Sequence, residues 1–536
     1  MAEFSVVDWS GGVSEITVPR DYNVAVDFVD RNICQGRGDK IAVIDDAGQY
    51  TYRDLAERVN RAGNMLLQLG IQQEQRVMIC LLDSVDFPAT FYGALKIGAI
   101  PIATNTLLTA RDYDFILRDS RARALVVSQD LLGRLRPILD DQPHLKHVVA
   151  AGSSDGTEYP VLDDLLGQAA KELDPAPTTA DDAAFWMYSS GTTGQPKGVV
   201  HAHADPVHVA ALFGQGVLGL TESDVVFSAA KLFFAYGLGN AMTFPFHVGA
   251  TTVLMAGRPT AETIHDQLVR HQPTVFYGVP TLYAMMLARD DLDCGKAAAN
   301  LRVCVSAGEA LPKDVGLRWK ARAGVDILDG IGSTEMLQTF LSNRPDDNRP
   351  GTTGKPVPGY EIRLVDDDFR DVEQGEVGEL LVKGQSMALC YWNQRQKSRD
   401  TFLGPWLRSG DKYFQDRDGY YVYAGRADDM LKVGGIWVSP FELESKLVEH
   451  DAVVEAAVIG HADHDDMIKP KAFVVLRNGY LSDPDSGPES RNALAEELKN
   501  FLKTSLAAYK YPRWIEFVDE LPKTATGKIQ RFKLRS

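Results

Sequence analysis

Short runs of β-branched and aliphatic residues alternate with segments of helical periodicity through the first two thirds of the chain. Residues 41–44 and 76–82 form two such apolar runs, and residues 52–69 and 87–97 carry apolar side chains at helical spacing. Further strand-like runs occupy residues 124–127, 251–254, 274–277 and 301–305. Strands that alternate with helices form mostly parallel sheets covered by helices on both faces. This pattern predicts a large mixed α/β domain.

The pattern then changes to short strands without intervening helices. Residues 361–365, 378–382 and 419–423 are short strand-like segments separated by Gly and Asp turns. Such spacing is typical of antiparallel hairpins. We therefore expect a small antiparallel β unit to follow the parallel sheets.

A charged break at residues 425–429 divides the chain a second time. Two helical patterns and two strand-like runs follow it, which is typical of a small α+β domain. A chain of 536 residues is also too long for one compact core. We predict a large N-terminal domain of residues 1–427 and a small C-terminal domain of residues 428–536.

Charge and cysteine content narrow the functional classes. The formal net charge of −17 argues against a nucleic acid partner. The five cysteines show no Cys-x-x-Cys spacing, which predicts reduced thiols in a cytosolic protein rather than a zinc site or disulfides. Because we find no signal peptide and no apolar run long enough to span a bilayer, we expect a soluble cytoplasmic protein without a membrane partner. The oligomeric state stays open, with a homodimer among the arrangements considered.

A loop rich in Gly, Ser and Thr occupies residues 186–198, with the sequence WMYSSGTTGQPKG. Glycine lets the backbone approach a phosphate, hydroxyls and N–H groups donate to its oxygens, and Lys197 adds positive charge. The candidate phosphate ligands are Ser189, Ser190, Gly191, Thr192, Thr193, Gly194 and Lys197. The loop lacks the GxxxxGK[ST] spacing of a Walker A motif. Taken alone, it could also be a flexible turn.

The full loop resembles the phosphate loop of the adenylate-forming superfamily, which includes acyl- and aryl-CoA ligases, peptide-synthetase adenylation domains and luciferases. The other family motifs follow in order at residues 306–310, 329–335, 409–411, 425–429 and 521–528. Each has an ordinary structural explanation when taken alone. Because all six occur in the family's order, the resemblance extends over essentially the whole chain.

The resemblance implies a role for each matching residue. Those that would contact the nucleotide are Gly308, Glu309, Ala310, Asp329, Gly330, Ile331, Gly332, Thr334 and Asp411. Glu335 is similar to the family's Mg²⁺-binding carboxylate, and Lys528 to the lysine that bridges the acid and the α-phosphate. Arg426 would lie near the nucleotide and Asp428 would be the interdomain hinge. The implied catalytic residues are therefore Lys528, Glu335 and Arg426.

The resemblance also implies a two-step reaction that uses Mg²⁺, ATP and CoA. The acid would attack the α-phosphorus of ATP, and the CoA thiol would then displace AMP from the acyl-adenylate. The family is understood to rotate its mobile C-terminal domain between the two steps. In this chain the rotation would bring Lys432, Gly434 and Gly435 to the channel for the pantetheine arm.

An aromatic segment at residues 231–240 resembles the acyl pocket of the benzoate and hydroxybenzoate–CoA ligase branch, although it could also be ordinary core. The predicted walls of a short, flat pocket are Phe234, Ala235, Tyr236, Ala307, Gly308 and Ile331. Gln338 departs from the pattern, in which a His is expected. Its amide could donate to or accept from a ring hydroxyl. We therefore favour 4-hydroxybenzoate over benzoate, provided that Gln338 is available to the ligand.

Several alternatives remain open. The substrate could be another small aryl or medium-chain acid, and a stand-alone adenylation enzyme would deliver its product to a carrier protein. A luciferase-like oxidase would share the ATP chemistry, whereas a nucleotide sensor would lack Lys528 or Glu335, and both are present. His201 and His203 could be metal ligands, although roles at a helix start and at the pocket edge fit them better.

Overall fold

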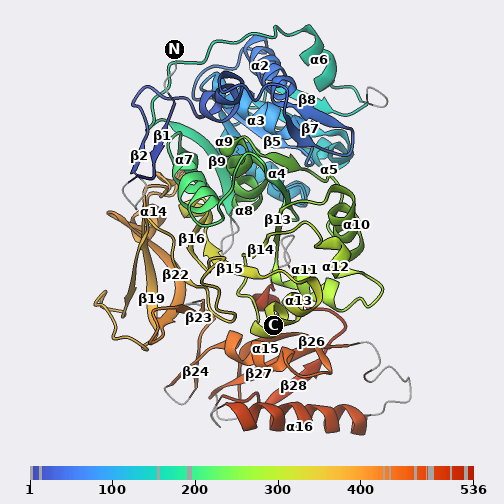
Figure 1. Cartoon of the computed structure of the whole chain (residues 1–536), viewed down its shortest axis with the longest axis vertical. Coiled ribbons are helices and arrows are strands. Elements are labelled where there is room, and N and C mark those ends of the chain that lie inside the picture. Colours follow the sequence, from blue (N-terminus) through green and yellow to red (C-terminus); the bar gives the residue numbers. More distant parts are fainter. Residues whose placement is uncertain are drawn as a thin grey trace.

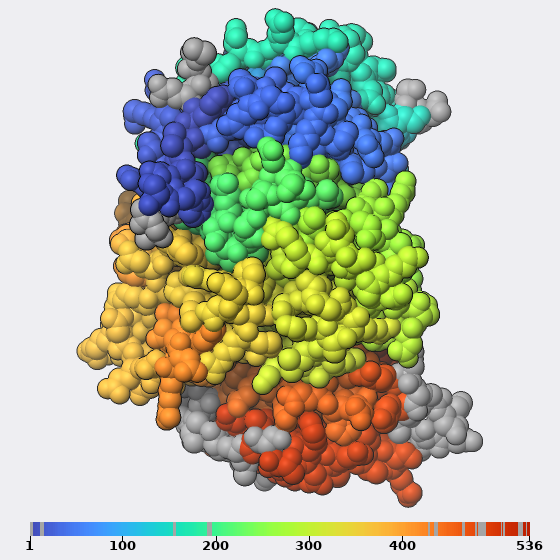
Figure 2. Space-filling view, viewed as in Figure 1, coloured from blue at the N-terminus to red at the C-terminus, as the bar shows by residue number. Residues whose placement is uncertain are grey.

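The computed structural model places the first part of the chain at one end of the molecule and the C-terminal domain at the other (Figures 1 and 2). It describes residues 4–10, 15–153, 157–189, 196–426, 429–433, 436–463, 467–477, 480, 488–506, 510–523 and 529–535. All statements below concern these residues.

The first large sheet is mostly parallel and has the strand order β20-β10-β9-β6-β5-β7-β8. Its strands are β5 (Arg76–Cys80), β6 (Ile100–Ala103), β7 (Ala124–Ser128), β8 (His147–Ala151), β9 (Ala183–Ser189), β10 (Lys197–Ala202) and β20 (Cys390–Tyr391). The pairs β6–β5, β5–β7, β7–β8 and β6–β9 are parallel, whereas β10 is antiparallel to both β9 and β20.

Both faces of this sheet are buried, which explains why its strands are continuous apolar runs in the sequence. In β5, Val77 and Ile79 enter the main core, while Met78 and Cys80 enter a second core. The main core contains side chains of α2 (Tyr52–Gln68) and α3 (Asp86–Lys96), and the second contains side chains of α4 (Ala110–Ser120) and α5 (Gln129–Leu139).

The second large sheet has the order β17-β16-β15-β14-β13-β11-β12-β3-β4. Its strands are β3 (Ile41–Ile44), β4 (Gln49–Thr51), β11 (Val225–Ser228), β12 (Thr251–Val253), β13 (Val275–Gly278), β14 (Val303–Ser306), β15 (Ile327–Gly332), β16 (Thr339–Ser342) and β17 (Lys355–Pro356). The central pairs are parallel. β3, from the beginning of the chain, also pairs in parallel with β12.

Helices connect and cover these strands. The α-helices between β10 and β15 are α7 (Asp205–Val209), α8 (Ala235–Leu238), α9 (Phe244–Val248), α10 (Ala261–His271), α11 (Pro280–Leu287), α12 (Cys294–Ala297) and α13 (Lys313–Ala323). Capping boxes begin α2, α4 and α10, where Thr51, Thr109 and Thr260 accept from the N3 backbone N–H. These caps satisfy N–H groups that have no partner within the helix.

The antiparallel unit follows as predicted. Its strands are β18 (Glu361–Val365), β19 (Gly378–Lys383), β21 (Phe402–Leu403), β22 (Trp406–Gln415) and β23 (Tyr421–Arg426), with α14 (Arg395–Thr401) beside them. All the strand pairs of this unit are antiparallel.

The C-terminal part of the chain has its own apolar core, formed around Leu443, Leu447, Val458 and Leu498. Its elements are β24 (Leu431–Val433), β25 (Ile436–Val438), α15 (Pro440–Val448), β26 (Val453–Ala462), β27 (Ile468–Leu476), α16 (Pro488–Ser505) and β28 (Trp514–Phe517). Figure 1 shows this α+β region in orange and red below the large sheets. The predicted mixed α/β fold class is therefore confirmed. Among the described helices, none is both long and apolar enough to cross a membrane.

Candidate active site

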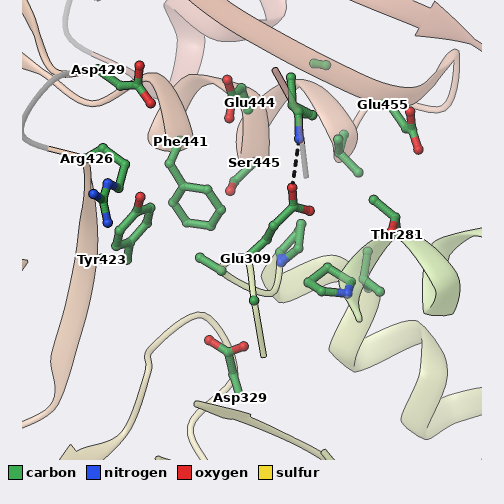
Figure 3. A pocket seen from close by; sticks show the side chains of 18 of the residues that line it. Thr281, Glu309, Asp329, Tyr423, Arg426, Asp429, Phe441, Glu444, Ser445 and Glu455 are labelled. Carbon is green, nitrogen blue, oxygen red and sulfur yellow. Dashed lines mark hydrogen bonds between the residues drawn. The ribbon is translucent and has the colours of Figure 1, made fainter. Parts of the chain in front are cut away.

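A cavity of about 780 Å³ lies between the large sheets and the C-terminal region. Among its lining residues are nine that the sequence predicts to surround the nucleotide: Gly308, Glu309, Ala310, Asp329, Gly330, Ile331, Gly332, Asp411 and Arg426. Figure 3 shows Glu309 and Asp329 on one side of the cavity and Arg426, Asp429 and Glu444 on the other. The fold thus brings four distant motifs to one place, and their contact with a nucleotide stays a prediction.

Arg426 and Asp411 pair at the cavity wall. The two residues face each other across the antiparallel strands β22 and β23, and Arg426 Nη1 donates to Asp411 Oδ1 at 3.1 Å. The Asp411 carboxylate is nearly buried. This arrangement gives the site a carboxylate that could accept from sugar hydroxyls and a guanidinium that could donate to phosphate oxygens.

Glu335 is held by a tyrosine that sequence motifs did not indicate. Glu335 lies in the 3₁₀ turn Thr334–Met336, and Tyr391 donates its phenol hydrogen to Glu335 Oε1 at 2.7 Å. Lys197 Nζ lies 4.9 Å from the centre of the Tyr391 ring. Burial lowers the pKa of Lys197, and the nearby Glu335 carboxylate opposes that shift.

This cluster fits the predicted magnesium role of Glu335. Its Oε2 accepts no hydrogen bond from any described residue, so one oxygen remains for a cation. Mg²⁺ is commonly held by one or two carboxylates together with substrate phosphates and water. No group of three or more His, Cys, Asp or Glu that could hold a metal occurs among the described residues, and magnesium binding by Glu335 stays a prediction.

His201 links the strand after the phosphate loop to the magnesium segment. Its Nδ1 lies 2.7 Å from Asp205 Oδ2, and its Nε2 lies 2.7 Å from the Thr334 carbonyl oxygen. The Asp205 carboxylate and the Thr334 carbonyl thus present acceptor oxygens to the two nitrogens of the buried ring. The pair fixes the backbone that carries Glu335.

The histidines therefore have structural partners, and metal ligation is not supported for them. His203 Nδ1 accepts from the Val24 N–H at 3.2 Å, and burial lowers the pKa of His203 to about 4. His201 itself lies in β10 rather than at a helix start, and its partner Asp205 is the first residue of α7. Sequence reasoning missed the link to Thr334 because it joins segments that are distant in the chain.

Gln338 forms hydrogen bonds with the protein itself, which weighs against its predicted contact with a ring hydroxyl. Its Nε2 donates to the carbonyls of Ala235 at 3.1 Å and Tyr236 at 2.9 Å. Its Oε1 accepts from the Thr339 N–H and hydroxyl, and the residue is 3% exposed. The argument for 4-hydroxybenzoate required a free amide, and this amide is in use.

The Gln338 contacts depend on a glycine at position 239. A Cβ there would lie 2.2 Å from Gln338 Nε2, which real Cβ atoms do not tolerate. Gln338, which directly precedes β16, thereby holds the segment that carries the predicted acid pocket. In that segment Phe234, Ala235 and Tyr236 are partly exposed and pack against the main core, as does Ile331, while Ala307 is buried.

The ends of the phosphate loop are described, whereas its centre is not. Ser189 and Lys197 face each other across β9 and β10, and Ser189 Oγ is buried without a hydrogen-bond partner among the described residues. The remaining predicted residues that lie outside the described part are Ser190, Gly191, Thr192, Thr193, Gly194, Asp428, Gly434, Gly435 and Lys528. Lys432 lies in β24, and its side chain is also outside the description.

Comparisons with known proteins find similar proteins along the whole length of the chain. A model of the AMP-binding enzyme family matches residues 30–392, and a model of the AMP-binding enzyme C-terminal domain matches residues 442–528. The chain is 57% identical to benzoate–CoA ligase of Thauera aromatica, over 100% of both chains. It is 51% identical to 4-hydroxybenzoate–CoA/benzoate–CoA ligase of Rhodopseudomonas palustris, over 96% of this chain and 94% of the relative.

A solved structure is similar throughout. The anthranilate CoA ligase in complex with anthranoyl-AMP superposes with a TM-score of 0.91 and 46% sequence identity. The match covers 96% of this chain and 97% of that chain.

Proposed function

The chain belongs to the AMP-binding enzyme family, and from this premise we propose that it is an ATP-dependent aromatic acid–CoA ligase. Benzoate or 4-hydroxybenzoate, ATP and CoA would give aroyl-CoA, AMP and diphosphate. The observation that carries the proposal is the convergence of the predicted nucleotide residues on one cavity. Gln338 in addition holds the aromatic segment through the Tyr236 carbonyl. The names of the two relatives support the acid class.

In the first half-reaction a carboxylate oxygen of the acid forms a bond to the α-phosphorus of ATP, and the bond to diphosphate breaks. Negative charge is spread over the phosphate oxygens, so catalysis is mainly positioning and neutralisation. Among the residues that the structure describes, Lys197 and Arg426 supply positive charge at the site. Lys528 would bridge both reactants. When Mg²⁺ is bound, it would neutralise phosphate charge from its place on Glu335.

In the second half-reaction the CoA sulfur forms a bond to the acyl carbon, and the bond to AMP breaks. We propose that residues 428–536 rotate about Asp428 as one domain between the steps, so that Lys432, Gly434 and Gly435 replace the lysine loop. The proposed location is the cytoplasm, where ATP and CoA are supplied. Light scattering would test whether the protein forms a homodimer in solution.

The acid specificity rests on the aromatic segment. Phe234 and Tyr236 provide flat apolar surface, and Tyr236 donates its hydroxyl hydrogen to the Gly278 carbonyl at 3.2 Å, which holds its ring in place. Because Gln338 is occupied, we propose benzoate and 4-hydroxybenzoate as comparable substrates rather than a preference for the hydroxylated acid.

The test is CoA-dependent AMP formation with Mg·ATP and a panel of acids. The panel contains benzoate, 4-hydroxybenzoate, 2-aminobenzoate, cinnamate, octanoate and acetate. Turnover of the benzoate-type acids well above octanoate and acetate is expected. If only octanoate or acetate reacts, the aromatic assignment is wrong and the adenylation chemistry remains. If AMP forms without CoA being consumed, the product passes to another acceptor.

The lysine assignment is tested in the same assay. Lys528→Ala should abolish most aroyl-adenylate formation and leave thioester formation from supplied aroyl-adenylate intact, because only the first step needs the bridging charge. Equal loss of both half-reactions would contradict this role for Lys528.

A further inference from the structure

Glu309 connects the large domain to the C-terminal region across the cavity. Its Oε1 accepts a hydrogen bond of 3.1 Å from the backbone N–H of Ile529. Figure 3 shows the Glu309 side chain reaching away from its own loop toward this donor, with the bond drawn as a dashed line. The sequence assigned Glu309 to the nucleotide, and the structure gives it a partner in the other domain.

The loop that presents Glu309 has a constrained backbone. It follows β14, and Gly308 has a φ of +93°, a value that strains residues with a Cβ. The turn at Gly308 directs the following side chain across the cavity rather than along the strand (Figure 3). Glu309 is thus built on a defined turn at the end of a buried strand.

Ile529 lies at the closed base of the C-terminal lysine segment. It forms an isolated antiparallel bridge with Lys523, and the N–H of Gln530 donates to the Pro522 carbonyl at 2.7 Å. Lys523 Nζ in turn contacts Glu455 Oε1 of β26 at 2.6 Å. The base is therefore anchored within its own domain, and Glu309 adds a bond to the large domain.

From these contacts we propose that Glu309 is a positioning residue for adenylate formation. By accepting the Ile529 N–H, it holds the residue that directly follows Lys528 against the cavity, and with it the orientation of the C-terminal domain. The proposal rests on the proposed function, in which Lys528 acts only in the first half-reaction. Acceptor and donor belong to different domains, so a rotation of the C-terminal domain breaks this bond.

A positioning role and a general structural role of Glu309 predict different effects on the two half-reactions. A bond present in only one domain arrangement changes the step that uses that arrangement and leaves the other step unaffected. The bond is charge-assisted, since a carboxylate accepts from a backbone N–H. Its loss should therefore lower adenylate formation about ten- to hundredfold.

The experiment measures the two half-reactions separately in Glu309→Ala, Glu309→Gln and wild type. Diphosphate release with benzoate and Mg·ATP, without CoA, reports the first step. Conversion of supplied benzoyl-adenylate and CoA to benzoyl-CoA reports the second. In Glu309→Ala the rate of the first step should fall about ten- to hundredfold, and the rate of the second step should stay within about twofold of the wild-type rate. Glu309→Gln should lie between, because its amide oxygen still accepts but carries no charge.

Glu442→Gln is the matched control. Its carboxylate contacts Lys510 within the C-terminal region and does not line the cavity. This control should leave both half-reactions unchanged. Equal loss of both steps in Glu309→Ala, or full retention of the first step, would overturn the proposal.

Hydrogen exchange provides a readout that does not depend on catalysis. The Ile529 amide should exchange faster in Glu309→Ala than in wild type, whereas amides of β19 should not change. Unchanged exchange at Ile529 would overturn the proposal even if activity fell. If wild type forms no adenylate with any acid, the proposed function fails, and the exchange result still decides whether Glu309 holds this segment.

Discussion

Tyr391 donates its phenol hydrogen to Glu335 Oε1 at 2.7 Å, so a residue of the first large sheet orients the carboxylate proposed to bind magnesium. The ring of Tyr391 also faces the Lys197 ammonium. The Tyr391 side chain thus contacts both the Glu335 carboxylate and the Lys197 ammonium, which belong to separate motifs.

Tyr391→Phe should weaken the use of Mg·ATP. The variant keeps the ring beside Lys197 and loses the donor to Glu335. A hydrogen bond to a charged group contributes about 1.5–3 kcal/mol, so we expect kcat/KM for Mg·ATP to fall about ten- to hundredfold. Steady-state kinetics at several magnesium concentrations measure this. Tyr420→Phe removes a phenol–carboxylate contact with Asp347 outside the cavity lining and should have no such effect.

His201→Phe should impair both stability and adenylation. The ring would still stack on Phe185, but the contacts to Asp205 and the Thr334 carbonyl would be lost. A buried polar group left without its partner costs about 1–3 kcal/mol, measured as the free energy of unfolding in denaturant. His201→Gln, which can restore one donor, should recover part of the adenylation rate. If His201→Phe lowers stability and leaves adenylation unchanged, the link to Glu335 has no catalytic consequence.

Gln338→Ala should lower activity with benzoate and 4-hydroxybenzoate by similar factors. The amide supports the carbonyls of Ala235 and Tyr236, so its removal loosens the aromatic segment for any ring. The ratio of kcat/KM for the two acids should stay within about threefold, since a group bonded only to protein discriminates little between ligands. A selective loss of 4-hydroxybenzoate would show instead that Gln338 contacts the ring hydroxyl.

Asp83 should make stability depend on pH in an unusual direction. Burial raises the pKa of Asp83 from 3.8 to about 6, although Lys231 lies 3.9 Å away. The folded state then binds the proton more tightly than the unfolded state, so this group's contribution to stability falls as pH rises from about 4 to about 6. Asp83→Asn lacks this titration.

The difference is measured by denaturant unfolding at pH 4.5 and pH 7. Relative to wild type, Asp83→Asn should gain about 2 kcal/mol between these two pH values, because one pKa unit corresponds to about 1.4 kcal/mol and part of the unfolded-state titration lies below pH 4.5. Asp39→Asn, at an exposed surface pair with Arg53, is the matched control. A pH-independent difference between Asp83→Asn and wild type would contradict the raised pKa.

The helices and strands were predictable because burial of one face places apolar residues at a spacing typical of each element. Residues 361–365 and 52–69 match β18 and α2 closely, since strand alternation and helical spacing depend on neighbours in the sequence. The order of strands was not predictable in this way. Nothing local in residues 41–44 indicates that β3 pairs with β12 rather than with β5.

The candidate site was predictable where motifs carry it. Gly308, Asp329 and Asp411, which belong to three motifs, line one cavity, and their contact with a nucleotide stays a prediction. The roles of Tyr391 and His201 were not accessible, because each depends on a contact between distant segments. Gln338 shows the same limit, because its residue type does not reveal whether other groups of the protein already form hydrogen bonds with the amide.

The pairing of β3 with β12 also has a consequence for how the chain acquires its structure. During synthesis, residues 41–44 leave the ribosome long before residues 251–253 exist to receive them. At about 5–20 residues per second, this delay is roughly ten to forty seconds. During this time the edge of β3 that pairs with β12 has no neighbouring strand. An unpaired apolar strand edge makes the nascent protein prone to aggregation. Recombinant yield should therefore depend on chaperone supply and growth temperature more than on the stability of the finished enzyme.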